Sequence, residues 1–255
     1  AEKYIRREPG LVSSWRRFSR TISIHSEPAG GEVYLKDYSA PDKEWRLIGQ
    51  SPLDSLRLPR VRYRMKITKA AYLDSVTGIF PADAVVDVRL AKAQEFPSGA
   101  IFMKGGMYYA ENTGFDYLPE TELGDFLIDK FEVTNKEFMR FVESGGYQKR
   151  DSWKHPFIKD GRALTWNEAI AGFVDKTGRP GPASWEGGYY PQGQEDYPVA
   201  GVSWYEAAAY AEFAGKSLPS VYHWGGSASI TWIEFIVPLS NFNQKGPAPV
   251  GTYQG

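Results

Sequence analysis

Polar and apolar side chains alternate with a period of two across the first third of the chain. The clearest stretches are residues 21–25, 32–36, 62–68 and 86–90. Such alternation predicts β-strands that bury one face. Segments rich in Pro, Gly, Ser and Asp separate these stretches and have the composition of turns. We therefore predict a small all-β, antiparallel sandwich over residues 21–92.

The pattern changes after residue 96, where three short helices are predicted. Each begins with a Ser or Thr that is followed three positions later by Glu: Thr134 with Glu137, Thr165 with Glu168, and Ser203 with Glu206. In such a capping box the hydroxyl accepts from a free helix amide while the Glu side chain reaches back. Apolar residues then recur at helical spacing, which favours helices of about 8–12 residues. Short strands are expected at 125–129 and 197–202, so we predict an irregular α+β domain over residues 96–255.

A long loop rich in Gly, Pro and aromatic residues separates the second and third predicted helices, from residue 176 to 196. Aromatic side chains on a Gly-rich loop offer contact area to a ligand at a low cost in conformational entropy. Trp185, Glu186, Tyr189 and Tyr190 are therefore the candidate ligand-binding residues. The alternative is that these rings hold the loop against its own domain.

Two residues beside the predicted caps are assigned to the framework of the second domain. Asn135 directly follows the first capping threonine and is expected in a buried hydrogen-bond network. Trp204 directly follows the capping serine of the third helix and is expected in the core.

Composition and charge narrow the functional classes. The chain has 255 residues, enough for one or two domains, and a net charge of −1. Residues 1–95 carry 17 Lys and Arg against 12 Asp and Glu, whereas residues 96–255 carry 13 against 19. This shift predicts a domain boundary near residues 91–98, and the basic residues 1–20 are predicted to be a connector. The balanced charge argues against nucleic acid as a partner, and no apolar run approaches the ~20 residues of a membrane helix.

The sequence does not contain the side chains of a familiar catalytic centre. Cysteine is absent, which excludes disulfides, thiolate metal ligands and a cysteine nucleophile within these residues. His25, His155 and His223 lie far apart and lack the spacing of a metal site. We therefore predict no catalytic residue in this segment.

The first predicted domain resembles a PEGA domain. The matching pieces are residues 26–35 (SEPAGGEVYL), 49–53 (GQSPL), 56–59 (LRLP) and 66–72 (KITKAAY). Gly31 and Ser51 stand where that family usually carries Ala and Thr. The resemblance implies a β-sandwich that serves as a spacer or binding module, commonly on the outer side of bacterial membranes, and it implies no catalysis.

The second predicted domain resembles the formylglycine-generating-enzyme and sulfatase-modifying-factor family. The resemblance is carried, in family order, by residues 126–135, 198–207, 215–220 with Trp224, 240–242 and 249–251. It implies the C-type-lectin-like fold of that family over residues 96–255, in a C-terminally incomplete form. It also implies calcium as a candidate cofactor, with Asn241 and Phe242 at the metal site. The alternative is that Asn241 serves as a turn residue and binds no metal.

Active members of that family use a pair of cysteines and copper to oxidise a cysteine of their substrate. By the resemblance, such a pair would lie beyond Gly255, and copper is expected only if it is present there. Within these residues the resemblance therefore implies no cofactor other than calcium.

Residues 32–38, 177–182 and 221–224 resemble a bacterial subset in which a PEGA domain and this module follow a Ser/Thr protein kinase. The chain itself lacks the kinase motifs. The first hypothesis is thus a non-catalytic sensory segment of a larger kinase-linked bacterial protein, which binds a peptide, glycan or protein. We expect it to be extracytoplasmic with a membrane tether upstream, and a cytoplasmic location is the alternative. The second hypothesis is a part of a formylglycine-generating-type oxidoreductase whose catalytic cysteines follow Gly255.

Overall fold

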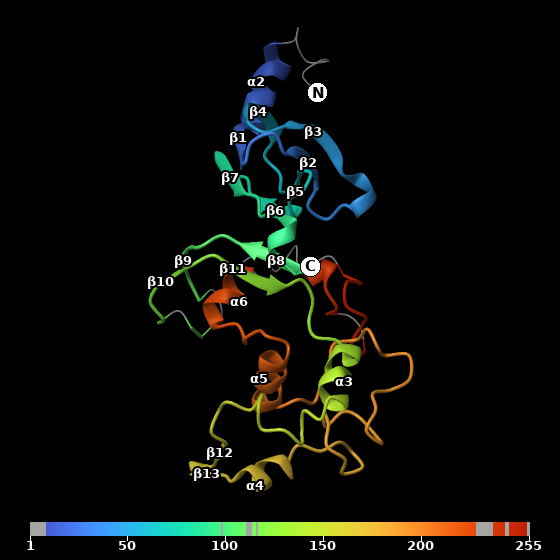
Figure 1. Cartoon of the computed structure of the whole chain (residues 1–255). Helices are drawn as coiled ribbons and strands as arrows, with labels where there is room; N and C mark the ends of the chain where they lie inside the picture. Colours follow the sequence, from blue (N-terminus) through green and yellow to red (C-terminus); the bar gives the residue numbers. More distant parts are fainter. Residues whose placement is uncertain are drawn as a thin grey trace. The chain divides into compact units, whose positions relative to one another are not determined.

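A computed structural model describes residues 9–97, 99–110, 114–115, 117–227, 237–242 and 245–253. The contacts within it divide the chain into two compact units (Figure 1). The first unit comprises Ala1–Gly106 and Glu122–Ile128, and the second comprises Met107–Thr121 and Asp129–Gly255. The expected boundary near residues 91–98 stays a prediction, and each unit is described by itself.

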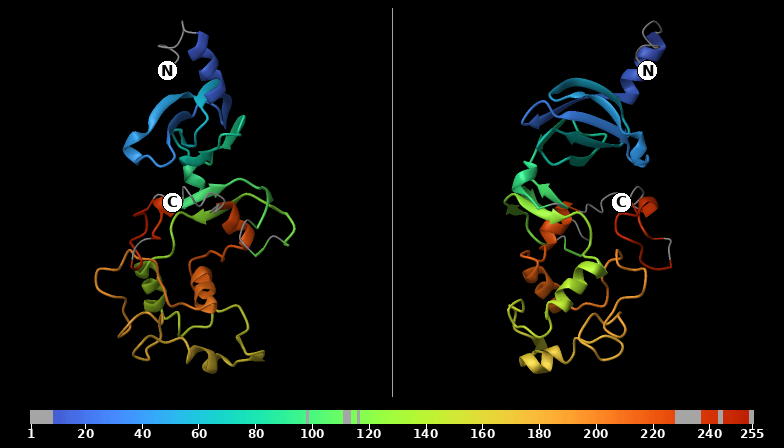
Figure 2. Two further views of the ribbon diagram at one scale, coloured as in Figure 1. Left: turned by 180° about the vertical axis from the view of Figure 1, so that it is seen from behind. Right: turned by 45° about the vertical axis from the view of Figure 1, so that its right-hand side comes forward.

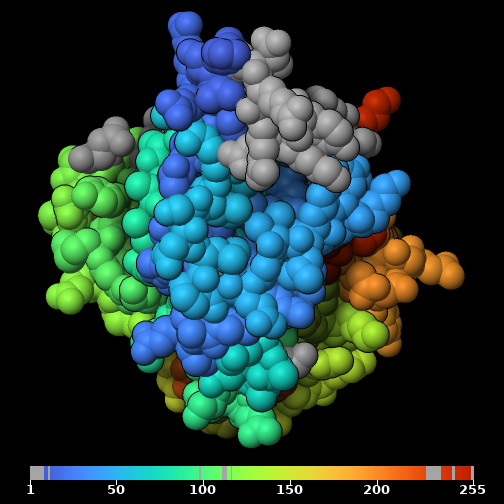
Figure 3. All heavy atoms as spheres, turned by 90° about the horizontal axis from the view of Figure 1, so that it is seen from above, coloured from blue at the N-terminus to red at the C-terminus, as the bar shows by residue number. Residues whose placement is uncertain are grey.

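The first unit begins with helix α2 (Pro9–Phe18), coloured blue in Figures 2 and 3, and contains two sheets (Figure 2). The three-stranded sheet has the order β4 (Leu53–Pro59), β1 (Ser19–Glu27), β7 (Val85–Arg89). The four-stranded sheet has the order β3 (Arg46–Gln50), β2 (Glu32–Asp37), β5 (Tyr63–Thr68), β6 (Ser75–Ile79). Two 3₁₀ turns, η1 (Asp42–Glu44) and η2 (Ala93–Glu95), complete this unit's helical elements among the described residues.

Side chains from both sheets form one hydrophobic core, as the period-two alternation predicts. Its buried members are Ile22, Ile24, Val33, Leu35, Tyr63, Met65, Ile67, Ile79 and Leu90. Burial of alternate side chains along β1, β2 and β5 explains why the sequence identified these strands. The pattern did not identify β3, β4 or β6. Strand β3 is exposed on nearly every residue, and β4 is interrupted by Ser55 at a φ of 58°.

The prediction of a purely antiparallel arrangement is wrong for one strand pair. Strands β1 and β7 run parallel, with Ile24 opposite Val86, whereas β1 and β4 run antiparallel. After β1 the chain forms β2 and β3, returns to one side of β1 as β4, forms β5 and β6, and then adds β7 to the other side of β1. Alternation of side chains reports which face is buried and contains no information on strand direction.

Four short strands lie between residues 100 and 129. Strand β8 (Ala100–Met103) pairs with β11 (Phe126–Asp129), and β9 (Gly106–Tyr108) pairs with β10 (Thr121–Leu123). Strand β11 confirms the strand predicted at 125–129.

All three predicted capping boxes are present in the second unit. They open helices α3 (Asn135–Glu143), α4 (Trp166–Ile170) and α5 (Trp204–Phe213). Helix α4 has 5 residues, fewer than predicted. Helix α6 (Val221–Ser227), η3 (Val237–Leu239) and the pair β12 (Ile158–Lys159) with β13 (Arg162–Ala163) complete the unit's described elements. The strand predicted at 197–202 is wrong, because Pro198 forms only an isolated bridge with Thr134.

The core of the second unit is aromatic, and a buried polar pair is packed within it. Its buried members are Phe138, Met139, Phe141, Tyr147, Trp185 and Ala209. The Tyr147 hydroxyl donates to Glu206 Oε1 at 2.6 Å, and Glu206 Oε2 accepts from the amide of Ser203 at 2.6 Å. Burial and the adjacent carboxylate raise the pKa of Tyr147 well above its usual value. The cap of α5 is therefore tied directly to the core.

Trp204 corrects a prediction, because 56% of it is exposed rather than buried in the core. It is the first residue of α5, and its ring lies edge-on to His155 with 4.7 Å between the ring centroids. A position in the first helical turn does not by itself determine which face is buried.

None of the described helices combines the length and the apolar character needed to cross a membrane.

Candidate functional site

Asp175 holds the beginning of the long loop 176–196. Its Oδ1 accepts from the amide of Thr177 at 2.7 Å, from the Thr177 hydroxyl at 2.8 Å and from the amide of Arg179 at 3.0 Å. Its Oδ2 accepts from the amide of Gly188 at 2.6 Å. Burial alone would raise the pKa of Asp175, but these hydrogen bonds outweigh burial and lower it to about 2. An ionised carboxylate with four donors makes this segment rigid.

The loop folds back on itself at Gly187 and Gly188. The amide of Glu186 donates to Tyr189 O at 2.9 Å, and the amide of Tyr189 donates to Glu186 O at 3.1 Å. Gly187 and Gly188 have φ values of 66° and 85°, the combination that a tight two-residue hairpin turn requires. The side chain of Arg179 donates to Gly187 O at 2.8 Å. Both glycines of the turn are therefore hydrogen-bonded to the segment 175–179.

Trp185, predicted to face a ligand, is fully buried, and this corrects its assignment. Its indole N–H donates to Asn135 Oδ1 at 2.9 Å. Its ring meets Phe138 edge-on, with 6.2 Å between the centroids. Tyr190 is half-buried and packs on Trp185 at a centroid distance of 5.5 Å. For these two rings the alternative that the sequence left open holds: they fix the loop to its own unit.

Asn135 also holds the end of the loop, which confirms its predicted place in a buried network. Its Nδ2 donates to Gln194 O at 2.8 Å, and its amide donates to Tyr197 O at 2.9 Å. One buried side chain therefore joins the first turn of α3 to the middle and the end of the loop.

Glu186 and Tyr189 remain as the exposed members of the predicted set. Tyr189 is 64% exposed, and Glu186 is exposed beside it. They face each other across the hairpin bridge, and side chains of directly paired residues lie on the same face. The turn thus presents a carboxylate and a phenol ring side by side on a backbone held by Asp175 and Trp185. This pair can bind a cationic group through an ion pair and a cation–π contact.

The sequence did not identify Asp175, Thr177 and Arg179 as the support of this pair. A signal was present, because an Asp two residues before a Thr and three before a Gly is typical of a turn in which the carboxylate accepts backbone amides. What it could not reveal is the contact with Gly188, 13 residues further along the chain.

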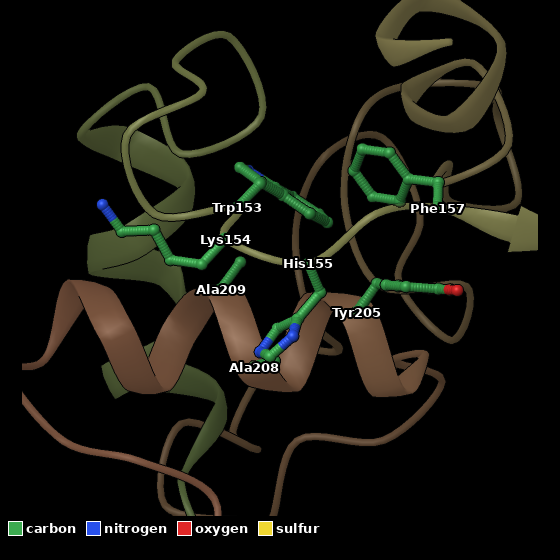
Figure 4. Close-up of a pocket in the computed structure, with 7 residues that line it drawn as sticks. All are labelled: Trp153, Lys154, His155, Phe157, Tyr205, Ala208 and Ala209. Atoms are coloured by element: carbon green, nitrogen blue, oxygen red, sulfur yellow. The ribbon is translucent and has the colours of Figure 1, made fainter. Parts of the chain in front are cut away.

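A depression between residues 153–157 and helix α5 is filled by aromatic packing. Figure 4 shows His155 directed toward α5, while Trp153 and Phe157 point to the other side of their segment. The ring centroids of Trp153 and Phe157 are 5.7 Å apart, and those of Phe157 and Tyr205 are 5.2 Å apart. Nothing of the size of a water molecule fits between them. We therefore assign this cluster to the fold and not to a ligand.

The residues predicted for calcium fit that ion only in part. Asn241 Nδ2 donates to Gly246 O at 2.9 Å, and Asn241 Oδ1 is buried without a hydrogen-bond partner among the described residues. Such an orphaned oxygen suits a calcium ligand, and Phe242 is exposed beside it. Calcium requires six or more oxygens, yet the described part of the chain has no group of three or more His, Cys, Asp or Glu placed to hold a metal. The calcium site stays a prediction.

The sequence was compared with known protein families and with curated proteins. Residues 88–242 match the sulfatase-modifying factor enzyme 1-like domain. The chain is 29% identical over 160 residues to the formylglycine-generating enzyme of Thermomonospora curvata. This alignment covers 54% of this chain and 51% of that enzyme.

Two other relatives have different names. The chain is 32% identical over 176 residues to the serine/threonine-protein kinase Pkn1 of Chlamydia trachomatis. This alignment covers 64% of this chain and 26% of the kinase. It is also 28% identical over 149 residues to the hercynine oxygenase of Mycolicibacterium thermoresistibile. That alignment covers 50% of this chain and 30% of the oxygenase. The chain thus spans about half the length of the first relative and about a quarter of the kinase.

Proposed function

The chain belongs to the family of sulfatase-modifying factor enzyme 1-like domains, and we propose that within this family it is a non-catalytic ligand-binding segment of a larger, kinase-linked protein. The family membership confirms the resemblance drawn from the motifs of the second domain. Relatives in this family include a formylglycine-generating enzyme, a hercynine oxygenase and a protein kinase. The name of the family alone therefore does not define the activity of this chain.

The exposed pair Glu186 and Tyr189 carries the proposal. Both are presented by a hairpin whose amides and carbonyls are bonded to Asp175 and Arg179, so little entropy is lost when a ligand binds. A carboxylate beside an exposed phenol ring suits a peptide that offers a Lys or Arg side chain. We therefore propose a basic segment of a protein or peptide as the ligand of this loop.

The first unit and the kinase relative support the rest of the proposal. Two sheets around one core suit a PEGA-like spacer, and the alignment with the Chlamydia kinase covers 64% of this chain. In this proposal a kinase precedes the segment in the whole protein. Ligand binding takes place outside the cytoplasm, on the far side of a membrane tether.

The second candidate function is a part of a formylglycine-generating-type oxidoreductase. It is favoured by the identity of 29% to the enzyme of Thermomonospora curvata. Copper in such an enzyme would need thiolate ligands, and these 255 residues contain no cysteine. The residues present here therefore do not fit the metal, and a catalytic pair would have to lie outside them.

Selection from a random peptide library displayed on phage tests the ligand-binding proposal. We expect the full chain to enrich peptides that contain Lys or Arg. Tyr189→Ala and Glu186→Gln should each lower their affinity at least about fivefold, because each removes one half of the pair. Tyr117→Ala is the matched control, since Tyr117 is 77% exposed in the same unit and lies outside the loop. Equal losses in Tyr117→Ala, or no basic peptides at all, would overturn the proposal.

A separate assay distinguishes the enzymatic alternative. The full-length protein, loaded with copper, is incubated with oxygen and a sulfatase-derived peptide that contains cysteine. Formation of formylglycine, seen as a mass change of the peptide, would establish the oxidoreductase. An unchanged peptide would remove that candidate and leave the binding segment.

A further inference from the structure

A basic pocket lies at the α2 end of the three-stranded sheet, within the first unit. Its volume is about 380 Å³. Four arginines from three elements line it, together with one carboxylate: Arg16 of α2, Arg20 of β1, Arg57 of β4, Arg60 after β4, and Asp83. The remaining lining residues are Ser19, Thr21, Pro81, Ala82 and Ala84, so no aromatic ring borders the pocket among the described residues.

Arg20 is the unusual member of this set. It is only 6% exposed, and its Nη1 donates to the backbone oxygen of Asp83. Its Nε and Nη2 have no hydrogen-bond partner among the described residues. Burial lowers the pKa of Arg20, and the negative charge of the nearby Asp83 offsets only part of this shift. Both nitrogens are themselves buried, so the guanidinium carries a poorly compensated positive charge beside the pocket, which is costly unless an anion lies close to it.

Ser19 positions two more arginines around the pocket. Arg57 Nε donates to the Ser19 hydroxyl at 2.8 Å, and Arg60 Nε donates to Ser19 O at 3.3 Å. Ser19 itself is 1% exposed, so both guanidiniums are held from a buried point. The Asp83 carboxylate is already engaged by the amide of Phe80 at 2.7 Å. Its single negative charge offsets one of the four arginine charges, so the pocket keeps an excess of positive charge.

We propose that this pocket binds a phosphoryl dianion. Planar guanidinium forks match the oxygens of a phosphoryl group. A dianion compensates more of the excess charge than a single carboxylate does. The lack of an aromatic platform disfavours a nucleotide base, so the phosphoryl group is either free phosphate or part of a phosphorylated side chain.

Calorimetric titration of the full 255-residue chain at low ionic strength tests this site. The probes are inorganic phosphate, phosphoserine and acetate. We expect both phosphoryl compounds to bind saturably and acetate to bind at least about tenfold more weakly. Tighter binding of phosphoserine than of phosphate would assign the site to phosphorylated side chains, and the reverse order would assign it to the free anion.

Charge variants separate the pocket from general attraction. Arg57→Gln and Arg16→Gln should each weaken phosphate binding by about tenfold, because each removes a charged donor. Arg46→Gln removes an exposed charge of the same unit outside the pocket and should change affinity by less than about twofold. Arg16 is exposed on the helix end, so its variant should fold even if Arg57→Gln does not.

Arg20→Met provides a readout that a purely structural arginine would not give. We expect the melting temperature to be maintained or raised while phosphate binding is lost, because the substitution removes an incompletely paired buried cation. The proposal is overturned by the absence of saturable phosphate binding, by equal affinity for acetate, or by equal losses in Arg46→Gln and Arg16→Gln.

Discussion

The indole N–H of Trp185 donates a 2.9 Å hydrogen bond to the side-chain oxygen of Asn135, 50 residues earlier in the chain. This bond joins the first turn of α3 to a loop that otherwise lacks regular secondary structure. Because both side chains are buried, neither can exchange its partner for water. The rigidity of the exposed Glu186–Tyr189 pair therefore depends on a contact beneath it.

Asn135→Leu should destabilise the second unit by about 2–3 kcal/mol. The substitution leaves the Trp185 indole N–H and Gln194 O without their buried partner, which is more costly than losing an exposed hydrogen bond. Urea denaturation followed by tryptophan fluorescence measures the change. Asn167→Leu, at an exposed position of α4, is the matched control and should cost less than about 0.5 kcal/mol. Similar values for the two variants would contradict this prediction.

Gly188→Ala should destabilise the hairpin turn by about 1 kcal/mol or more. Its φ of 85° is readily adopted by glycine but strained for alanine. A Cβ at this position would meet the side chain of Arg179 only at an ordinary contact distance of 3.6 Å, so the strain comes from the backbone. Thermal melting measures the loss. Gly124→Ala, where the backbone is not left-handed and a Cβ meets nothing within 4 Å, should leave the melting temperature nearly unchanged.

The second unit should lose stability as the pH falls from about 4 toward about 2. The hydrogen bonds to Asp175 lower its pKa from 3.8 to about 2 in the folded protein. A depressed pKa stabilises the fold above the unfolded value, and this contribution is lost as the carboxylate is protonated. Glu168, whose pKa is lowered to about 2 by the amide and hydroxyl of Thr165 and by Arg162, acts in the same direction.

Asp175→Asn should reduce stability near neutral pH and flatten this acid dependence. Melting temperatures of the wild type and the variant, measured between about pH 7 and pH 2, provide the comparison. The exposed Asp151→Asn should follow the wild-type curve. A variant curve parallel to that of the wild type would show that Asp175 does not contribute.

His25 should stabilise the three-stranded sheet at mildly acidic pH. Its Nε2 lies 3.0 Å from Asp54 on β4, and its Nδ1 lies 3.0 Å from Asp87 on β7. The hydrogen bonds to Asp54 and then to Asp87 raise the pKa of His25 above 6.5. A raised pKa stabilises the fold fully below the unfolded value, and the contribution disappears as the pH rises through the folded value.

Hydrogen exchange of peptides from β1 and β7 measures this effect, with wild type and His25→Gln compared at the same pH. Protection should differ at about pH 5.5 and converge at about pH 9. His155→Gln, at an exposed position of the other unit, should not change protection in these peptides. A difference between wild type and His25→Gln that grows with pH would contradict the assigned direction.

The sequence by itself determined the local structure wherever one short pattern was sufficient. Side-chain alternation identified β1, β2, β5 and β7, because burial of one face imposes a period of two. Three capping boxes were identified for the same reason, since both partners lie within four consecutive residues. The family of the second domain also followed from its motifs.

Only the tertiary structure decided the direction of β7 and the roles of the loop residues. Trp185 and Tyr189 are both aromatic residues of one Gly-rich segment, and the sequence could not separate them. Trp185 is buried because Asn135 and Phe138 surround it, whereas the turn at Gly187 and Gly188 places Tyr189 in solvent. The pocket around Arg20 is likewise formed by segments that are far apart in the sequence, from residue 16 to residue 84. Such contacts depend on where distant segments meet, and local patterns contain no information on that.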